Sequence, residues 1–419
     1  MIKCKLGEIL KVKHGYAFKS EFYGESNVTL VTLANISDKN SFKYNEKKAT
    51  HYCAEYPSDF NLYPGDLVMP LTEQVIGLFG NTALIPEVKG IQFVLNQRVG
   101  KIIPLEGKSD LKFLHFLLAT EHVKNQLEAR ASAGTKQRNI SPEDIYDVEV
   151  EIPEYKDQKK IGEFLYNLEN QINLNSKLFT NYKEYIDLLY NKWFLDFEFP
   201  DKQGKPYKSN GGKMVDNKLI LTKVPDNWSV KTLDNCELLS LISTGINTFD
   251  GKKKYLATAD VDNNSIKEGS FITYEDRESR ANMQPIPNSI WFAKMKNSVK
   301  HITVCNDSTW LINDYIFSTG FMGFKCNNDS FAYIFAYINN NSFEKIKDMR
   351  SSGSTQEGIN DGDLCLFPII IPEKELLLKF SNLVDPMLKT MDKLIQCNKN
   401  IESYLKYILP IALSNQLKM

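Results

Sequence analysis

The sequence lacks the features that place a chain in a membrane or outside the cell. Its longest strongly apolar run, residues 364–371, is far shorter than the ~18–20 residues of a membrane-spanning helix, and Pro368 interrupts it. The opening residues, MIKCKLGEIL, contain no apolar core of a signal peptide. The 7 cysteines include no C-x-x-C pair, which argues against a zinc site and a disulfide framework. We therefore expect a cytoplasmic protein without contact to a membrane.

Motifs of catalysis are also missing. The sequence has no G-x-x-x-x-G-K-[ST] segment and no Asn-Pro-Pro or Asp-Pro-Pro run of an amino-methyltransferase. Its 5 histidines lack the spacing of a metal site. Asp201, Asp216 and Lys218 fit a loose nuclease pattern, but the glycine-rich segment around them predicts no strands to hold them in place. We expect a non-catalytic chain with no metal or cofactor of its own.

An excess of charge of either sign is absent as well, because the formal net charge is −1. The lysines are nevertheless clustered. One cluster lies near the start of the chain, and two more lie at residues 252–254 and 294–300. Each cluster alone is typical of a solvated loop, but their recurrence in both halves of the chain favours a nucleic-acid partner.

An internal repeat is the strongest feature that is present. The segment 134–154, GTKQRNISPEDIYDVEVEIPE, aligns without a gap with 353–373, GSTQEGINDGDLCLFPIIIPE. The shared residues are Gly134/Gly353, Gln137/Gln356, Ile140/Ile359, Asp144/Asp363 and the closing Ile-Pro-Glu. Further matches pair residues 111–120 with 330–339, 30–36 with 255–261, and 63–70 with 286–293. The chain is therefore expected to contain two β-rich modules of the same fold.

A long helix is predicted behind each module. Along the first helix, apolar residues recur at alternating intervals of four and three residues, which is typical of the contact face, or seam, of a coiled coil. It comprises Ile161, Leu165, Leu168, Ile172, Asn175, Phe179, Tyr182, Ile186, Leu189 and Trp193. The second comprises Val384, Leu388, Met391, Ile395, Asn398, Glu402, Leu405, Leu409 and Ala412. Asn175 and Asn398 occupy equivalent positions and are predicted to fix the register. Pro386 and Pro410 are expected to shorten the second helix, and packing of either helix on its own module is the alternative.

These features predict an α+β protein with five parts. They are module 1 (1–153), a central helix (154–198), a linker rich in Gly, Pro, Lys and Asn (199–223), module 2 (224–372) and a distal helix (373–419). Antiparallel pairing of the two helices would form a coiled coil that separates the two modules. An approximate two-fold axis would then relate one module to the other.

The central strings LLYNKWFLDFEFP (188–200), DKQGKPYKSNGGKMV (201–215) and VPDNWSVKTL (224–233) resemble the specificity (S) subunits of Type I restriction–modification systems. So do the two G-S/T-x-Q segments with their helices, and the resemblance covers essentially the whole chain. It implies that each module is a target recognition domain for one half of a bipartite, asymmetric DNA site. It also implies docking of two methyltransferase (M) subunits and of motor–nuclease (R) subunits, which would carry S-adenosylmethionine, ATP and Mg²⁺.

Candidate DNA-binding residues follow from side-chain chemistry, because amides, guanidinium groups and carboxylates recognise base edges and lysines recognise phosphates. The base-reading candidates are Thr72, Glu73, Gln74, Asn96, Gln97 and Arg98 in module 1, and Asn247, Arg277, Arg280 and Asn297 in module 2. The phosphate candidates are Lys11, Lys13, Lys19, Lys252, Lys253, Lys254, Lys294, Lys296 and Lys300. Tyr16 is a further DNA-binding candidate of module 1. Lys136, Gln137, Thr355 and Gln356 close the modules, either as structural turns or near DNA. Exposed loop side chains without a DNA role are the alternative for each.

Two other functions remain open at this point. One is the specificity subunit of a related system in which nuclease and methyltransferase share one polypeptide. The other is a coiled-coil scaffold that recruits partners without contacting DNA.

Overall fold

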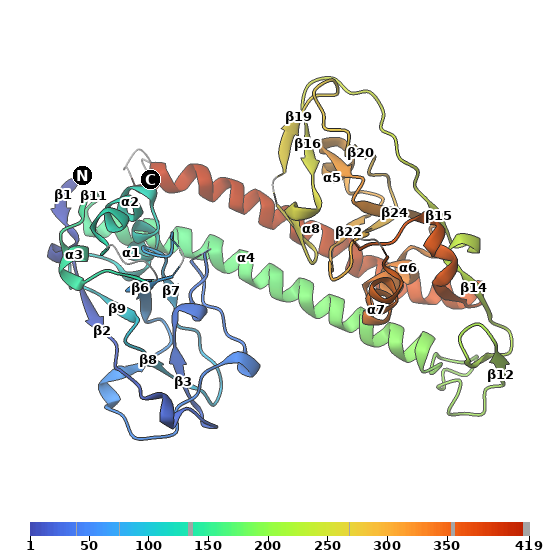
Figure 1. Ribbon diagram of the computed structural model, residues 1–419, viewed down its shortest axis with the longest axis horizontal. Coiled ribbons are helices and arrows are strands. Elements are labelled where there is room, and N and C mark those ends of the chain that lie inside the picture. Colours follow the sequence, from blue (N-terminus) through green and yellow to red (C-terminus); the bar gives the residue numbers. More distant parts are fainter. Residues whose placement is uncertain (39, 75, 133–136, 268, 353–356, 414–419) are drawn as a thin grey trace. The chain divides into compact units, whose positions relative to one another are not determined.

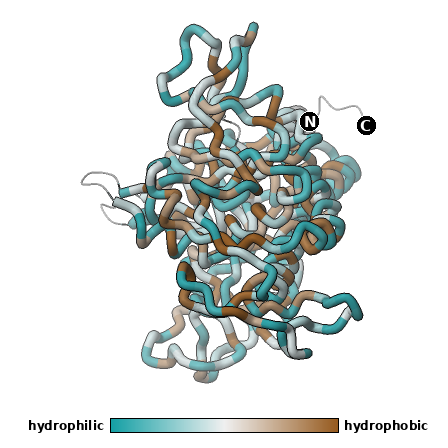
Figure 2. Tube along the Cα trace, turned by 90° about the vertical axis from the view of Figure 1, so that its right-hand side faces the viewer, coloured by the Kyte–Doolittle hydropathy of each residue, from teal (hydrophilic) through white to brown (hydrophobic). Residues whose placement is uncertain are grey.

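The computed structural model describes residues 1–38, 40–74, 76–132, 137–267, 269–352 and 357–413, with side chains as far as Ile408. The chain divides into two compact units. Unit 1 comprises Met1–Gln171 with Ile401–Met419, and unit 2 comprises Ile172–Asn400. Among the described residues, no helix combines the length and the apolar character needed to cross a bilayer. Figure 2 shows that the peripheral loops consist mainly of hydrophilic residues.

Module 1, in unit 1, has a mixed α+β architecture (Figure 1). Its strands are β1 (Ile2–Lys5), β2 (Leu10–His14), β3 (Val28–Val31), β4 (Asn61–Leu62), β5 (Leu67–Pro70), β6 (Thr72–Glu73), β7 (Ala83–Leu84), β8 (Gln92–Leu95), β9 (Val99–Pro104), β10 (Arg138–Asn139) and β11 (Glu149–Ile152). Its helices are α1 (Leu111–Leu118), α2 (Glu121–Arg130) and α3 (Pro142–Tyr146). The side chain of Asp110 caps α1 by accepting from the Phe113 amide over 3.0 Å.

Module 2, in unit 2, repeats this architecture with additions (Figure 1). Its strands are β14 (Ser229–Thr232), β15 (Leu239–Leu241), β16 (Lys253–Leu256), β17 (Val261–Asp262), β18 (Ser265–Ile266), β19 (Ser270–Ile272), β20 (Ala281–Met283), β21 (Ser289–Ala293), β22 (His301–Val304), β23 (Tyr315–Ser318), β24 (Phe321–Cys326) and β25 (Pro368–Ile371). Its helices are α5 (Thr309–Asp314), α6 (Phe331–Asn339) and α7 (Asn341–Arg350). Phe331–Ile338 of α6 are all buried, since this helix is apolar on every side.

The predicted repeat is confirmed by the strand topology. The four-stranded sheet β2-β9-β5-β7 of module 1 corresponds to β15-β24-β21-β22 of module 2. The parallel pair β3–β8 corresponds to β16–β23, and the antiparallel pair β1–β11 corresponds to β14–β25. Helices α1 and α6, which align in sequence, each pack on the four-stranded sheet of their own module, α1 against β9 and α6 against β21. The two halves thus share strand order and pairing direction as well as sequence.

The two long helices are α4 (Tyr155–Tyr190), which a π-helical turn extends over Asn191–Leu195, and α8 (Lys374–Leu413). Within unit 2 they run antiparallel, because Trp193 contacts Phe380 at 5.7 Å between ring centroids while Asn175 meets Asn398. Within unit 1, Leu405 and Ile408 of α8 pack on the core that contains Ile161 and Leu165 of α4.

The expectation that Pro386 and Pro410 shorten the second helix is wrong. Helix α8 continues through both prolines. A proline inside a helix costs one hydrogen bond and about 3 kcal/mol. Burial of Val384, Leu388 and Met391 on the same face of the helix offsets this cost.

The segment 199–223 is a folded element and not only a linker. It contributes β12 (Met214–Asn217), which pairs with β13 (Thr222–Pro225). The ring of Phe199 stacks on Tyr207 at 4.6 Å and on Trp228 at 4.8 Å between centroids. Aromatic stacking therefore attaches the polar segment to the core of unit 2.

Candidate nucleic-acid interface

The structure brings the predicted base-reading segments of module 1 together at one end of the sheet β2-β9-β5-β7. The Tyr16 amide donates to Leu95 O and the Gln97 amide donates to Tyr16 O, each over 2.9 Å. The Leu71 amide donates to Arg98 O over 2.9 Å. Strand β6, which follows Leu71, pairs with β10 and so brings in residues 137–139. We call the segments 15–16, 71–74, 96–98 and 137–139 the module 1 edge.

The module 1 edge exposes amide and guanidinium groups. Gln74, Gln97 and Arg98 are exposed, and Gln137 is half-buried with its Nε2 donating to Asn139 Oδ1 over 3.0 Å. Gly15 permits the close approach of β2 to this edge, because a β-carbon there would lie 2.1 Å from Asn96 O. These groups are the side-chain types that recognise guanine and adenine edges.

Three predicted base readers of module 1 have structural roles instead. Glu73 is only 1% exposed, and its carboxylate bonds Arg138 and the amides of Gly77 and Leu78. Thr72 donates to Asn139 Oδ1 over 2.9 Å and is buried. The Oδ1 of buried Asn96 accepts from the Arg98 amide over 3.2 Å. Contact with a base would break these internal bonds, so we correct the assignment of all three residues.

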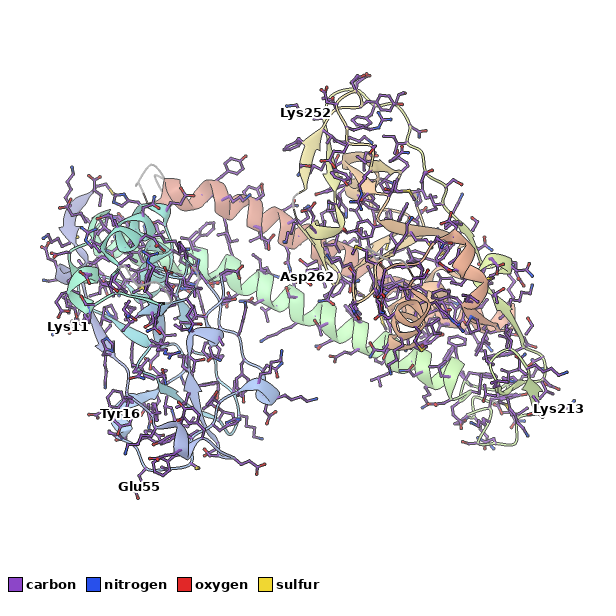
Figure 3. All side chains as sticks on the ribbon, viewed as in Figure 1. Lys11, Tyr16, Glu55, Lys213, Lys252 and Asp262 are labelled. Carbon is purple, nitrogen blue, oxygen red and sulfur yellow. The ribbon has the colours of Figure 1, made fainter. Side chains whose placement is uncertain are left out.

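The candidate phosphate lysines Lys11, Lys13 and Lys19 of module 1 lie on or after β2. Lys11 is exposed on the part of the strand farther from the module 1 edge, and Lys19 is exposed and 3.9 Å from Glu21 (Figure 3). Lys13 donates to Asp59 O and lies 5.1 Å from the ring centroid of Phe60. Tyr16 packs edge-on against Phe18 with centroids 5.0 Å apart. Lys13 and Tyr16 therefore have partners within the module.

Module 2 has an equivalent edge with different chemistry. The Lys294 amide donates to Gly320 O over 3.0 Å, as Leu71 does to Arg98 in module 1. The guanidinium group of Arg280 lies beside Gly320, since a β-carbon there would be 3.2 Å from Arg280 Nη2. Asn297 is exposed, with φ of 55°, and its amide donates to Asp348 Oδ1 over 2.9 Å. We call the segments 294–297, 319–320 and 357–358 the module 2 edge.

A buried ionic cluster holds the loop between β21 and β22, which begins at Lys294. Lys347, which is 0% exposed, lies 2.6 Å from Glu344 and donates to Ser298 O over 2.8 Å. His301 bonds Glu344 over 2.8 Å, and burial lowers the pKa of this histidine. Lys300 donates to Thr258 O over 2.6 Å. The loop is therefore fixed at both ends by α7 and by its neighbours.

The other candidates of module 2 lie apart from this edge. Residues 252–254 precede or begin β16, whereas Gly320 lies beyond the end of β23, the parallel neighbour of β16. Figure 3 shows Lys252 and Asp262 beyond opposite ends of β16. Lys253 lies 5.3 Å from the ring centroid of Phe249, Lys254 lies 5.6 Å from that of Phe271, and Arg277 lies 4.0 Å from that of Tyr274. Asn247 is exposed in the loop that precedes β16.

Lys136, Thr355 and Gln356 lie outside the described residues. Sequence reasoning missed Arg138 and its aligned counterpart Glu357, which pair with Glu73 and Lys296. The signal was present in the alignment of the two repeats, where Arg138 and Glu357 follow the shared glutamine. Among the described residues, no three His, Cys, Asp or Glu side chains form a group that could hold a metal ion.

Comparison with known proteins gives three findings. Residues 2–180 match the family model described as the Type I restriction modification DNA specificity domain. The chain is 27% identical over 174 residues to a Type I restriction enzyme specificity subunit, MjaVIII, from Methanocaldococcus jannaschii. That match spans 41% of this chain and 40% of the relative. A solved S subunit from M. genitalium superposes with a TM-score of 0.54 at 17% identity, covering 98% of this chain and 94% of that one.

Proposed function

We propose that this chain is a Type I restriction–modification specificity subunit whose two modules read the two halves of a bipartite, asymmetric DNA site. The match of residues 2–180 to the model of the specificity domain and the likeness to the MjaVIII specificity subunit support this assignment. The carrying observation is the convergence of residues 71–74, 96–98 and 137–139 at the module 1 edge. These segments are far apart in the sequence, and at one edge they offer several donors and acceptors to one stretch of a groove.

The two edges differ in side-chain chemistry although their backbones correspond. Arg98 of module 1 is replaced by Gly320 of module 2, and a different guanidinium group, that of Arg280, lies beside the glycine. Different donor patterns select different bases. The two half-sites are therefore expected to differ in sequence, which makes the whole site asymmetric.

The helices provide the proposed docking surface for two M subunits. Leu174, Leu178, Tyr185 and Leu188 of α4, all within unit 2, are between 39% and 68% exposed. Each lies one position before a seam residue, about 100° around the helix from it. Exposed apolar residues repeated along one helix face are typical of a protein–protein interface. R subunits would join through that complex.

The chemistry of methylation and cleavage is assigned to the partners. S-adenosylmethionine and the methyl transfer would belong to the M subunits, and ATP and Mg²⁺ to the R subunits. The residues of this chain would supply recognition alone: cationic groups near phosphates for affinity, and amides and guanidinium groups at base edges for specificity.

The test is a methylome experiment. The chain is expressed with its M subunits in a host that lacks DNA methylation, and the methylated bases are mapped with and without the gene for this chain. We expect one methylated motif with two different halves separated by a fixed gap. A methylation pattern that does not depend on this gene would overturn the proposal and leave the scaffold function. A gel shift with bipartite oligonucleotides and the M partner provides the binding measurement.

A further inference from the structure

Module 1 contains an ion pair across the two strands β6 and β10 that form part of the module 1 edge. Arg138 of β10 stands opposite Glu73 of β6, and their Nη1 and Oε1 atoms are 2.8 Å apart. Arg138 also pairs with Glu128 of α2 and donates to its carbonyl oxygen over 2.8 Å. The second oxygen of Glu73 accepts from the amides of Gly77 and Leu78. The ion pair therefore connects three elements: the β6–β10 strand pair (the ladder), the loop that follows β6, and α2.

Module 2 has the equivalent pair. The Lys296 amide donates to Glu357 O over 3.0 Å, and Lys296 Nζ lies 2.6 Å from Glu357 Oε2. The ladder that carries the pair is the same in both modules, because the bond from Ile140 N to Leu71 O, 3.0 Å long, corresponds to that from Ile359 N to Lys294 O, 3.1 Å long. Arg138 thus corresponds to Glu357, and Glu73 corresponds to Lys296, so the two charges are exchanged.

The exchange of charges separates two possible roles. A residue that neutralises a phosphate must be a cation, but the position of Arg138 is an anion in module 2 and the position of Lys296 is an anion in module 1. What both modules retain is an ion pair across the same ladder. Its role is therefore to hold the geometry of the ladder and not to supply a charge to DNA.

The residues that flank the pair carry the side-chain amides of the edge. Exposed Gln74 follows Glu73, and Gln137 precedes Arg138. Exposed Asn297 follows Lys296, and its φ of 55° places its backbone in the left-handed region. A side-chain amide can form two hydrogen bonds with adenine, but only if its backbone is held in a fixed orientation.

We propose that Glu73–Arg138 and Lys296–Glu357 are positioning pairs that aim Gln74 and Gln137 in module 1, and Asn297 in module 2, at base edges of the half-sites. This inference rests on the proposed function of the chain. The ion pairs contact no base themselves. They act by fixing the ladder whose end carries the amide side chains, so that breaking one pair affects the half-site read by that module alone.

Module 2 offers the sharper experiment, because Lys296 and Glu357 are 35% and 50% exposed and can be changed without opening a core. The variants are Lys296→Glu, Glu357→Lys and the double exchange, each assembled with the M subunits. Binding is measured against oligonucleotides with single changes in either half-site and over a range of salt. Each single variant places like charges across the ladder and should lose discrimination by tenfold or more at one half-site. The double exchange restores the pair and should return discrimination to within about threefold of the wild type.

A matched control is the pair Lys231–Glu237, which is 2.5 Å long and 36% and 55% exposed. Its single variants should leave discrimination unchanged. If the Lys296 variants behave like this control, the positioning role is overturned. If Lys296→Glu weakens binding to every sequence equally and the double exchange stays weak, Lys296 is a phosphate contact and the proposal is also overturned. A wild-type complex without preference for either half-site would instead contradict the proposed function itself.

Discussion

Asn175 of α4 and Asn398 of α8 meet in the antiparallel helix pair of unit 2, with Asn175 Nδ2 donating to Asn398 Oδ1 over 2.8 Å. Asn398 also donates to Ile172 O and to Ser176 Oγ, each over 3.3 Å. Asn175 is only 5% exposed. A displaced register would leave these amides buried without partners, so the pair favours one alignment of the helices.

Replacing one member of this pair should cost more stability than replacing both. Asn175→Leu leaves the Asn398 amide without its main partner and should lower the free energy of unfolding by about 1–3 kcal/mol. Asn175→Leu with Asn398→Leu removes both polar groups and should be neutral or stabilising. Urea denaturation of Asn175→Leu, Asn398→Leu and the double variant measures this. A double variant that is less stable than either single variant would show that the amides contribute stability and not register.

Arg98→Ala should relax recognition at one base position of one half-site. Arg98 is exposed at the module 1 edge, and a bidentate guanidinium contact is worth about 1–3 kcal/mol of discrimination. Methylome sequencing of cells that carry the variant should show one degenerate position and an unchanged second half. Lys89→Ala, at an exposed lysine outside the module 1 edge, is the control. An unchanged motif in the Arg98 variant would remove this residue from the set of base readers.

Lys252→Ala should weaken binding to all sequences alike. Lys252 is exposed in the loop before β16, away from the module 2 edge, where a cation can contribute affinity but little sequence information. The slope of log affinity against log salt should fall in magnitude by about 0.9. Equilibrium binding to specific and unrelated DNA at several salt concentrations measures the slope, with exposed Lys218→Ala as the control. Loss of affinity for only one target sequence would contradict the role.

The sequence predicted the fold where spacing along the chain carries the information. The repeated segments encode a repeated ladder, and the alternation by four and three encodes two long helices. It failed for Thr72 and Glu73, because their burial depends on Asn139 and Arg138, which are more than 60 residues away in the chain. It also failed for Pro386, since only the packing of neighbouring apolar residues decides whether a helix tolerates a proline. The lysine clusters at 252–254 and 294–300 look alike in sequence, and only the parallel pairing of β16 with β23 separates them.

Leu188→Glu should disrupt binding of an M subunit without unfolding the chain. Leu188 is 68% exposed on α4, so a charge there costs little in the isolated chain but would be buried in the proposed interface. Affinity for the M subunit, measured by calorimetry, should fall by at least tenfold. Leu221→Glu, at a leucine that is 90% exposed, is the matched control and should have no effect. Equal affinities of the two variants would place the M subunit on another surface.

Asp385 of α8 gives a pH dependence of stability that can be isolated. Its Oδ1 has no hydrogen-bond partner within the described part of the chain, and it lines a cleft of about 210 Å³ with Asn288, Asn306 and Asn328. Burial raises the pKa of Asp385 to about 6, against an opposing effect of Lys389. The native state therefore holds the proton more tightly than the unfolded state. Stability from this group is present at low pH and is lost as the pH rises through about 4 to 6.

Asp385→Asn should remove that loss. The full pKa shift corresponds to about 3 kcal/mol, and because the carboxyl is partly exposed, screening by solvent reduces the expected gain at pH 8 to about 1–2 kcal/mol. Urea denaturation at pH 5 and pH 8 should show the variant gaining stability relative to the wild type as the pH rises. Asp307→Asn, at an exposed carboxylate two residues after Cys305 of the same cleft, should show no such gain. If both variants respond equally, the effect belongs to net charge and not to the buried oxygen of Asp385.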